Sequence, residues 1–147
     1  MPEEVKIING GVSIDDRGEL QFFNSIDLTQ IKRFYTMSNH KSHFIRAWHA
    51  HKNESKIITV ISGTALICAV KISNWKNPNK KSKVFRKVIS SKKPELIHIP
   101  KGYANGTMTL EKNTKLIFFS DSTLEESIND DYRYTYNHWN PWTIIQR

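Results

Sequence analysis

Short segments rich in β-branched and aromatic residues follow one another along the chain, and no crossover helix fits between them. Most are bounded by Gly, Asn, Ser or Asp, which is typical of strands joined by turns. The expected strands cover residues 19–23, 31–37, 44–51, 56–62, 64–72, 84–89, 95–99 and 114–119. A doubly wound α/β fold is excluded, because it needs helices between its strands. We therefore expect an all-β barrel or two-sheet sandwich of the jelly-roll type.

Two local signals refine this expectation. Ser62 and Gly63 stand between two apolar segments and indicate a tight hairpin turn. Residues 123–131 are the one stretch that resembles a helix, with Ser122 or Thr123 as its N-cap and acidic residues near its positive end. We therefore expect a single short helix near the C-terminus.

The length of 147 residues suits a single domain, 1–147, with an ordinary core. No apolar stretch approaches the roughly 18 residues that a transmembrane helix needs, so we expect no membrane association. Glu3 and Glu4 stand where a secretory signal would carry cations, which favours a cytoplasmic protein. The single cysteine, Cys68, lies in an apolar run, where a buried inert thiol is the default.

The formal net charge of +8 comes from the stretch 71–101, which holds ten basic residues and the single acid Glu95. Such an excess suggests an anionic partner. Nucleic acid is one candidate, because Trp75 lies among these lysines. Residues 74–82, which hold Trp75 and three of the lysines, are expected to form a solvated loop and not a stacking platform of spaced aromatics. We therefore do not expect nucleic-acid binding.

The densest group of reactive side chains is Arg-Ala-Trp-His-Ala-His-Lys at 46–52, with Lys56 on the next expected strand. Side chains alternate along a strand, so His49 and His51 project to the same side. They are either a satisfied surface pair or a catalytic pair. Two imidazoles that titrate near neutral pH suit proton abstraction from carbon, and nearby cations could hold an enolate or a diphosphate.

A metal site is the second interpretation of His-x-His, because imidazoles at this spacing bind zinc, iron or nickel in cupin barrels. Such sites add a glutamate and a third histidine on a later strand. Glu54 is only roughly in place, and Asn105 stands where the histidine would be needed. We therefore expect neither a metal nor another cofactor.

These motifs together resemble the nucleotide-sugar cupins typified by dTDP-4-dehydrorhamnose 3,5-epimerases and dTDP-sugar 3,4-ketoisomerases. The 46–52 motif is similar to the ketoisomerase signature Arg-Gly-x-His-Ala-His-Lys and to the epimerase signature Arg-Gly-x-His-Tyr-Gln. Residues 99–106 resemble the epimerase stretch Ile-Pro-x-Gly-Phe-Ala-His-Gly. Residues 15–20 resemble the family's opening segment, and 130–142 its acidic, aromatic tail. The resemblance implies a cupin jelly roll.

The resemblance also implies a metal-independent isomerase acting on a 4-keto-6-deoxyhexose carried by dTDP or another nucleoside diphosphate, for cell-surface polysaccharide synthesis. A base removes the proton beside the ketone. Its return to the same carbon from the other face is epimerisation, and its delivery to the carbonyl carbon moves the ketone. By position, the family assigns catalysis to His49, His51 and Lys56. It assigns substrate contacts to Arg46, Lys52 and Asn105. Arg17 and Glu19 of the opening segment are expected to help receive the nucleotide diphosphate in a dimer.

The sequence departs from the epimerases at Phe118, which stands where they carry a catalytic tyrosine. Tyr35 resembles a tyrosine near the ketoisomerase site and could carry the proton instead. Two histidines suit a shuttle between neighbouring carbons, so we favour 3,4-ketoisomerisation. The alternatives are 3,5- or 3-epimerisation of the same substrates and a non-catalytic nucleotide-sugar or carbohydrate-binding cupin. The family resemblance further implies a homodimer, and the aromatic residues of the tail need burial somewhere.

Overall fold

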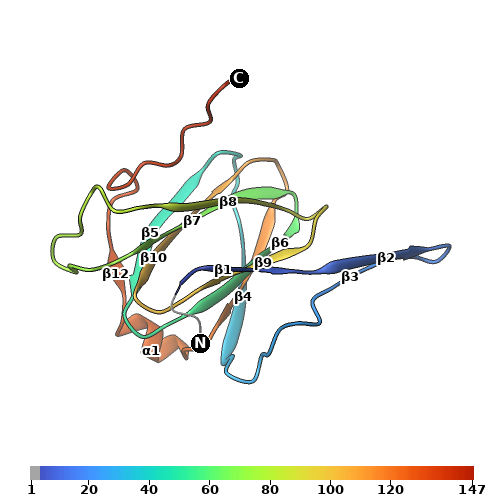
Figure 1. The fold of residues 1–147 in the computed structure, drawn as a ribbon, viewed down its shortest axis with the longest axis horizontal. Coiled ribbons are helices and arrows are strands. Elements are labelled where there is room, and N and C mark those ends of the chain that lie inside the picture. Colours follow the sequence, from blue (N-terminus) through green and yellow to red (C-terminus); the bar gives the residue numbers. More distant parts are fainter. Residues whose placement is uncertain (1–3) are drawn as a thin grey trace.

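Two five-stranded antiparallel sheets face each other in the computed structural model, which describes residues 4–147 (Figure 1). Glu3, used above in the argument against a secretory signal, lies outside the described residues. The first sheet has the order β1 (Lys6–Asn9), β9 (Glu95–Ile99), β6 (Lys56–Ser62), β11 (Lys115–Ser120) and β4 (Arg33–Ser38). The second has the order β12 (Tyr132–Arg133), β5 (Ile45–His51), β10 (Tyr103–Thr109), β7 (Thr64–Lys71) and β8 (Phe85–Ser90). This arrangement confirms the all-β jelly roll.

A separate hairpin, formed by β2 (Gly11–Asp15) and β3 (Gly18–Phe22), extends away from the two sheets as an arm (Figure 1). Its strands pair with each other and with no other strand among the described residues. Several of its apolar side chains are exposed, including Ile14 at 73% and Leu20 at 68%. The arm therefore presents apolar surface that the rest of the chain does not cover.

One short helix, α1 (Leu124–Ile128), follows β11 and confirms the expected helix, although it is shorter than the range 123–131. Thr123 is its N-cap: the Thr123 side chain accepts from the Glu126 amide, and the Glu126 side chain accepts from the Thr123 amide. This reciprocal pair satisfies two backbone donors at the helix start. No helix within residues 4–147 has the length and apolar character to cross a bilayer.

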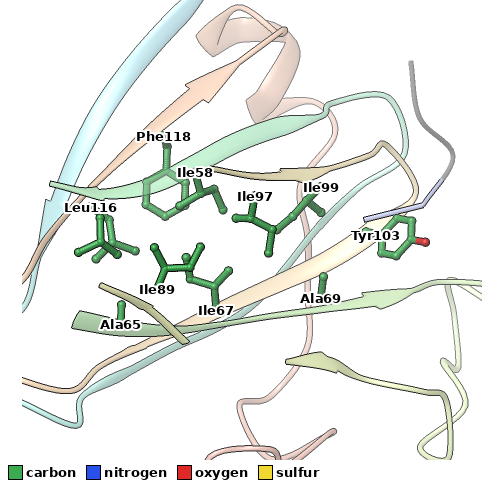
Figure 2. Close-up of a cluster of buried hydrophobic side chains, with 11 residues drawn as sticks. Ile58, Ala65, Ile67, Ala69, Ile89, Ile97, Ile99, Tyr103, Leu116 and Phe118 are labelled. Carbon is green, nitrogen blue, oxygen red and sulfur yellow. The ribbon is translucent and has the colours of Figure 1, made fainter. Parts of the chain in front are cut away.

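Strand β7 is buried on both faces, which explains its almost continuous apolar sequence. Ala65, Ile67 and Ala69 project between the sheets and pack against side chains of β6, β9 and β11 (Figure 2). Leu66, Cys68 and Val70 project to the opposite face, where they pack with Trp48 and the C-terminal tryptophans. The second sheet is thus covered on both sides.

The C-terminal segment after β12 provides that outer cover. Trp139 and Trp142 are buried against Trp48, and ring centroids lie 5.3 and 5.2 Å from the Trp48 ring. Cys68 lies in the same cluster, and burial raises the pKa of its thiol to about 12, as expected for an inert cysteine. Because Trp139 and Trp142 are buried within the chain, they offer no support for a dimer interface.

The eight expected strands are all present, and the bounds of β6 and β9 match. The strands β1, β2, β10 and β12 were not expected, and one predicted turn is wrong. β6 and β7 do not pair: at Gly63 the chain passes from the first sheet to the second, so the expected hairpin is wrong. β10 was not expected, because Asn105 and Gly106 have low β propensity. Burial between β5 and β7 overrides that propensity, since every residue of β10 is buried.

The basic loop between β7 and β8 is tied to the C-terminal tail. The Tyr134 hydroxyl donates to the Trp75 carbonyl (2.8 Å), and the Trp139 indole donates to the Asn79 carbonyl (2.9 Å). The Trp75 ring packs on Tyr132 with centroids 4.9 Å apart. This tryptophan therefore anchors the loop instead of forming part of a row of spaced aromatics.

Gly63 at the crossing between the sheets has φ +78°, and an added Cβ would lie 2.8 Å from the Thr114 Cα. We expect Gly63→Ala to lower the free energy of unfolding by about 1–2 kcal/mol for the left-handed backbone and about 1–3 kcal/mol for the clash. The matched control is Gly102→Ala, because Gly102 has φ +84° and open space around its Cβ position. Urea unfolding measures both. Equal losses would show that the contact with Thr114 adds nothing.

Candidate active site

A cavity of about 350 Å³ opens between the two sheets, beside α1. The first sheet contributes side chains from β4, β6 and β11, and the second contributes side chains from β5, β10 and β12. Leu124, Ser127 and Ile128 of α1 form part of its wall. The residues that line the cavity are Arg33, Tyr35, Met37, Arg46, His49, His51, Lys56, Asn105, Thr107, Phe118, Leu124, Ser127, Ile128, Asp131 and Arg133.

Strand β5 places three reactive side chains on this cavity. Trp48 and Ala50 are fully buried on its other face, so His49 and His51 face the space between the sheets. Arg46 lines the cavity too, although a three-residue separation from His49 would place it on the opposite face of a regular strand. The register of β10 against β5 shifts between Asn105 and Thr107, and this irregularity accounts for the placement.

The His51 ring has a fixed orientation. Its Nδ1 lies 2.6 Å from the Asp130 backbone carbonyl, which can only accept a hydrogen bond. Nδ1 therefore carries the proton of the neutral ring, and Nε2 keeps a lone pair. The Asp130 carboxylate in turn accepts from the backbone amides of Lys52 and Asn53 (2.9 and 2.8 Å), which holds that segment against the end of β5.

Both histidines are neutral at neutral pH. Burial, with the cations of Lys56 and Arg133, lowers the pKa of His49 to about 4. Burial and Lys56 also lower the pKa of His51, against the opposing effects of Glu54 and Asp130. A neutral imidazole can accept a proton, so the pair has the protonation state that a base requires.

Tyr35 is the hydroxyl-bearing aromatic side chain of the cavity. It pairs with Phe118 across the β4–β11 ladder, and the two rings stack with centroids 4.9 Å apart. Burial, and the charge of Glu54, raise the pKa of Tyr35 to about 12. The phenol therefore keeps its proton and is suited to act as a donor.

The cavity is electropositive. Four cationic side chains line it, Arg33, Arg46, Lys56 and Arg133, against the single carboxylate of Asp131. Asp131 accepts from the Arg133 Nε at 2.9 Å. The cations of Arg33 and Lys56 lie near the buried Glu54 carboxylate, and Arg46 has no carboxylate partner among the described residues. Charge-assisted contacts of this kind suit a diphosphate or a developing enolate.

The structure brings together six of the nine residues expected from the sequence: Tyr35, Arg46, His49, His51, Lys56 and Asn105. Arg17 and Glu19 lie instead on the β2–β3 arm, beside a separate hollow. Arg17 pairs there with Asp15. Lys52 does not line the cavity: its ammonium lies over the rings of Trp75 and Tyr132, 5.4 and 5.0 Å from their centroids.

Three charged residues that were not predicted from the sequence also line the cavity: Arg33, Arg133 and Asp131. They come from β4 and from the segment around β12, far from the histidine motif along the chain. The alternation in the 31–37 segment does place Arg33 on the same face as Tyr35, and that signal could have found it.

Glu54, considered above as a metal ligand, lies on the Nδ1 side of His51, with Oε1 3.7 Å from that atom. The Nε2 lone pair lies on the other side of the ring. Within residues 4–147, no group of three or more His, Cys, Asp or Glu side chains is placed to hold a metal ion.

Comparison with known proteins identifies the family. The family model described as dTDP-4-dehydrorhamnose 3,5-epimerase matches residues 3–140. The chain belongs to this family. Its members are isomerases of dTDP-linked sugars, and the chain is an enzyme of that class, an epimerase or a ketoisomerase. No curated protein sequence matches the chain.

Solved structures of two activities share the fold. The dTDP-4-dehydrorhamnose 3,5-epimerase of Bacillus anthracis, with TDP and PPi bound, is 21% identical with a TM-score of 0.77, over 97% of this chain and 86% of that one. A 3,4-ketoisomerase from Helicobacter canadensis is 20% identical with a TM-score of 0.68, over 94% and 96%.

A variant of the 3,4-ketoisomerase QdtA from Thermoanaerobacterium thermosaccharolyticum, in complex with TDP-4-keto-6-deoxyglucose, is 15% identical with a TM-score of 0.69, over 94% and 93%. These similarities establish the cupin jelly roll of the chain. At such identities they do not distinguish the two reactions, so the distinction must come from the residues of the cavity.

Proposed function

We propose that the protein is a metal-independent 3,4-ketoisomerase of a dTDP-linked 4-keto-6-deoxyhexose, serving deoxysugar synthesis for cell-surface polysaccharide. The observation that carries the proposal is the pair of neutral histidines, His49 and His51, on one strand face beside Tyr35. The phenyl ring of Phe118 occupies the ladder position opposite Tyr35 and carries no hydroxyl.

The reaction needs a proton acceptor at C3 and proton donors at the ketone oxygen and at C4. One histidine takes the C3 proton, and the C–H electrons form a C3=C4 enediolate. Tyr35 donates to the C4 oxygen, and Lys56 stabilises the charge that develops there. The Tyr35 phenolate then takes the proton of the C3 hydroxyl, which restores the phenol. The electrons return to C4, which takes a proton from the protonated histidine. The ketone now lies at C3.

The histidine spacing favours proton movement between neighbouring carbons. Residues two apart on one strand face lie roughly 7 Å apart along the backbone, so two rings can reach adjacent atoms of one sugar. Inversion at C3 and C5 requires, in addition, a donor on the opposite face of the sugar. Phe118 cannot supply it, which is why we favour ketone migration over epimerisation.

We propose that the dTDP diphosphate contacts Arg46 and the other cationic side chains of the cavity. Asn105 is fixed beside them, because its amide donates to the His49 carbonyl at 3.1 Å. Arg17 and Glu19 can contribute only if the β2–β3 arm reaches another subunit. We therefore propose a homodimer in which the exposed apolar side chains of the arm pack on the partner.

Incubation with dTDP-4-keto-6-deoxyglucose in heavy water, followed by proton NMR, tests the reaction. We expect the ketone to move from C4 to C3. His49→Asn and His51→Asn should each lose turnover by at least about 100-fold while dTDP affinity stays unchanged, because the rings act on the sugar. Deuterium at C3 and C5 with the ketone still at C4 would establish epimerisation instead. Saturable dTDP-sugar binding without any exchange would indicate a binding protein.

The role of Tyr35 is tested by moving its hydroxyl across the ladder. Tyr35→Phe should lower kcat by about 100-fold, because the enediolate loses its proton donor. Adding Phe118→Tyr should recover part of the activity, since the two rings stack on the same wall. The matched control adds Phe119→Tyr, which lies on the other face of β11, and should recover none. Full activity of Tyr35→Phe would exclude Tyr35 as the donor.

The arm is tested by mixing a variant that binds dTDP weakly with a variant that lacks turnover. Arg17→Ala should weaken dTDP binding by about tenfold, the value of one charge-assisted contact. His51→Asn lacks turnover but keeps its arm. If the arm acts on the partner subunit, mixed dimers restore activity at low substrate, with about a quarter of all sites intact after random exchange. Light scattering should give a dimer mass. A monomer, or no recovery on mixing, would contradict this arrangement.

A further inference from the structure

Glu54 lies directly behind the cavity wall, in the turn between β5 and β6, and its side chain is fully buried. It does not line the cavity. Its Oε2 accepts from the Ser120 hydroxyl at 2.8 Å and lies 3.5 Å from the Arg33 guanidinium and 3.9 Å from the Lys56 ammonium. A buried carboxylate is costly unless cations and donors compensate it, so this group is held in place by the cavity side chains themselves.

The second oxygen of this carboxylate faces His51. Oε1 has no hydrogen-bond partner among the described residues and lies 3.7 Å from the His51 Nδ1. The Nδ1 proton already points to the Asp130 carbonyl. When Nε2 receives a proton, the positive charge of the ring therefore develops beside an unpaired carboxylate oxygen.

We propose that Glu54 is the positioning residue that makes His51 the proton-holding member of the histidine pair: its carboxylate stabilises the His51 imidazolium and keeps the Arg33 and Lys56 cations on the cavity wall. This inference rests on the proposed function, since it assigns roles within that site. Glu54 touches no substrate. It acts through His51, Arg33 and Lys56.

The surroundings of the two histidines distinguish them. His51 faces Lys56 from β6, Asp130 from the segment after α1 and Glu54 from its own turn, and the ladder places Tyr103 of β10 opposite it. Among these, Glu54 and Asp130 favour the charged ring, and Lys56 opposes it.

His49 faces Lys56, Arg133, Asp131 and His51, and of these only Asp131 favours the charged ring. Asp131 is itself paired with Arg133 at 2.9 Å. A proton that resides on the histidine pair is therefore held by His51 in preference to His49.

The pH dependence has a definite sign. Because His51 must be neutral to accept a proton, kcat/KM rises as pH rises through the His51 pKa. The Glu54 charge raises that pKa, so its removal moves this limb to lower pH. Glu54 also raises the pKa of Lys56 and of Tyr35, which must keep their protons. Its removal therefore moves the alkaline limb to lower pH as well.

The decisive variant is Glu54→Gln, which keeps the shape of the side chain and removes its charge. NMR titration of the histidine rings in the ligand-free protein should show the His51 midpoint lower by about one pH unit, the effect of one nearby opposite charge. The His49 midpoint should stay unchanged, which is an internal control. The kcat should fall by at most about tenfold for such a shift, with both limbs of the pH profile displaced to lower pH.

Two matched variants separate charge from packing. Ser120→Ala removes the hydrogen bond to Oε2 and leaves the carboxylate charged, so both His51 and the pH profile should stay near the wild type. Glu54→Asp keeps the charge on a shorter side chain, so its His51 midpoint should lie between those of Glu54→Gln and the wild type. Thermal melting of each variant confirms that it is folded.

An unchanged His51 midpoint in Glu54→Gln would overturn the proposal, as would an equal displacement in Ser120→Ala. The titration needs no substrate, so it tests Glu54 even if the protein turns over a different sugar or none. A shifted His51 midpoint together with an undisplaced activity profile would overturn the assigned role of His51 and leave its contact with Glu54 intact.

Discussion

Burial of the Trp48 indole is the constraint on which the active site depends. Its Nε1 donates to the carbonyls of Tyr136 and Trp139 (3.1 and 3.2 Å), and its backbone exchanges two hydrogen bonds with Tyr134. A slip of one residue would place the indole in the cavity and turn His49 and His51 toward the aromatic tail. The C-terminal segment, which contributes no cavity-lining side chain beyond β12, therefore determines which way the histidines face.

The Lys56 cation has two opposing effects on the proposed reaction. Lys56 lowers the basicity of both histidines, which weakens them as proton acceptors. In the proposed reaction the same ammonium stabilises the enediolate that proton removal creates, in a site where low dielectric strengthens the interaction. A base that is neutral at working pH, next to a cation fixed before the reaction begins, gives stabilisation in the transition state more than in the ground state.

The sequence predicts the parts of this protein that depend on local pattern. Alternation places Tyr35, His49 and His51 in the cavity, and β6 and β9 have the expected bounds. It fails where tertiary packing decides. β10 is a central strand in spite of Asn105 and Gly106, and Lys52, though adjacent to His51 in the motif, leaves the cavity for the rings of Trp75 and Tyr132.

The surroundings of Glu54 are likewise not predictable from the sequence. Its spacing after the histidines only roughly fits a metal ligand, and the position of its oxygens on the Nδ1 side of His51 shows that it faces the back of the ring. Neither Arg33 nor Ser120, its partners, lies near it in the chain. A buried charge cluster assembled from β4, β6, β11 and a turn has no signature in any single segment of sequence.

The pair Tyr35 and Phe118 explains why family membership leaves the reaction outcome open. They are direct partners across one rung of the β4–β11 ladder, so either strand can present a hydroxyl to the same wall of the cavity. Moving that hydroxyl from one strand to the other would shift which atoms of a sugar it reaches, while the backbone and the core stay the same. If Tyr35 has the proposed role, two reactions can share one jelly roll, because the choice between them depends on the placement of single proton carriers on a fixed frame.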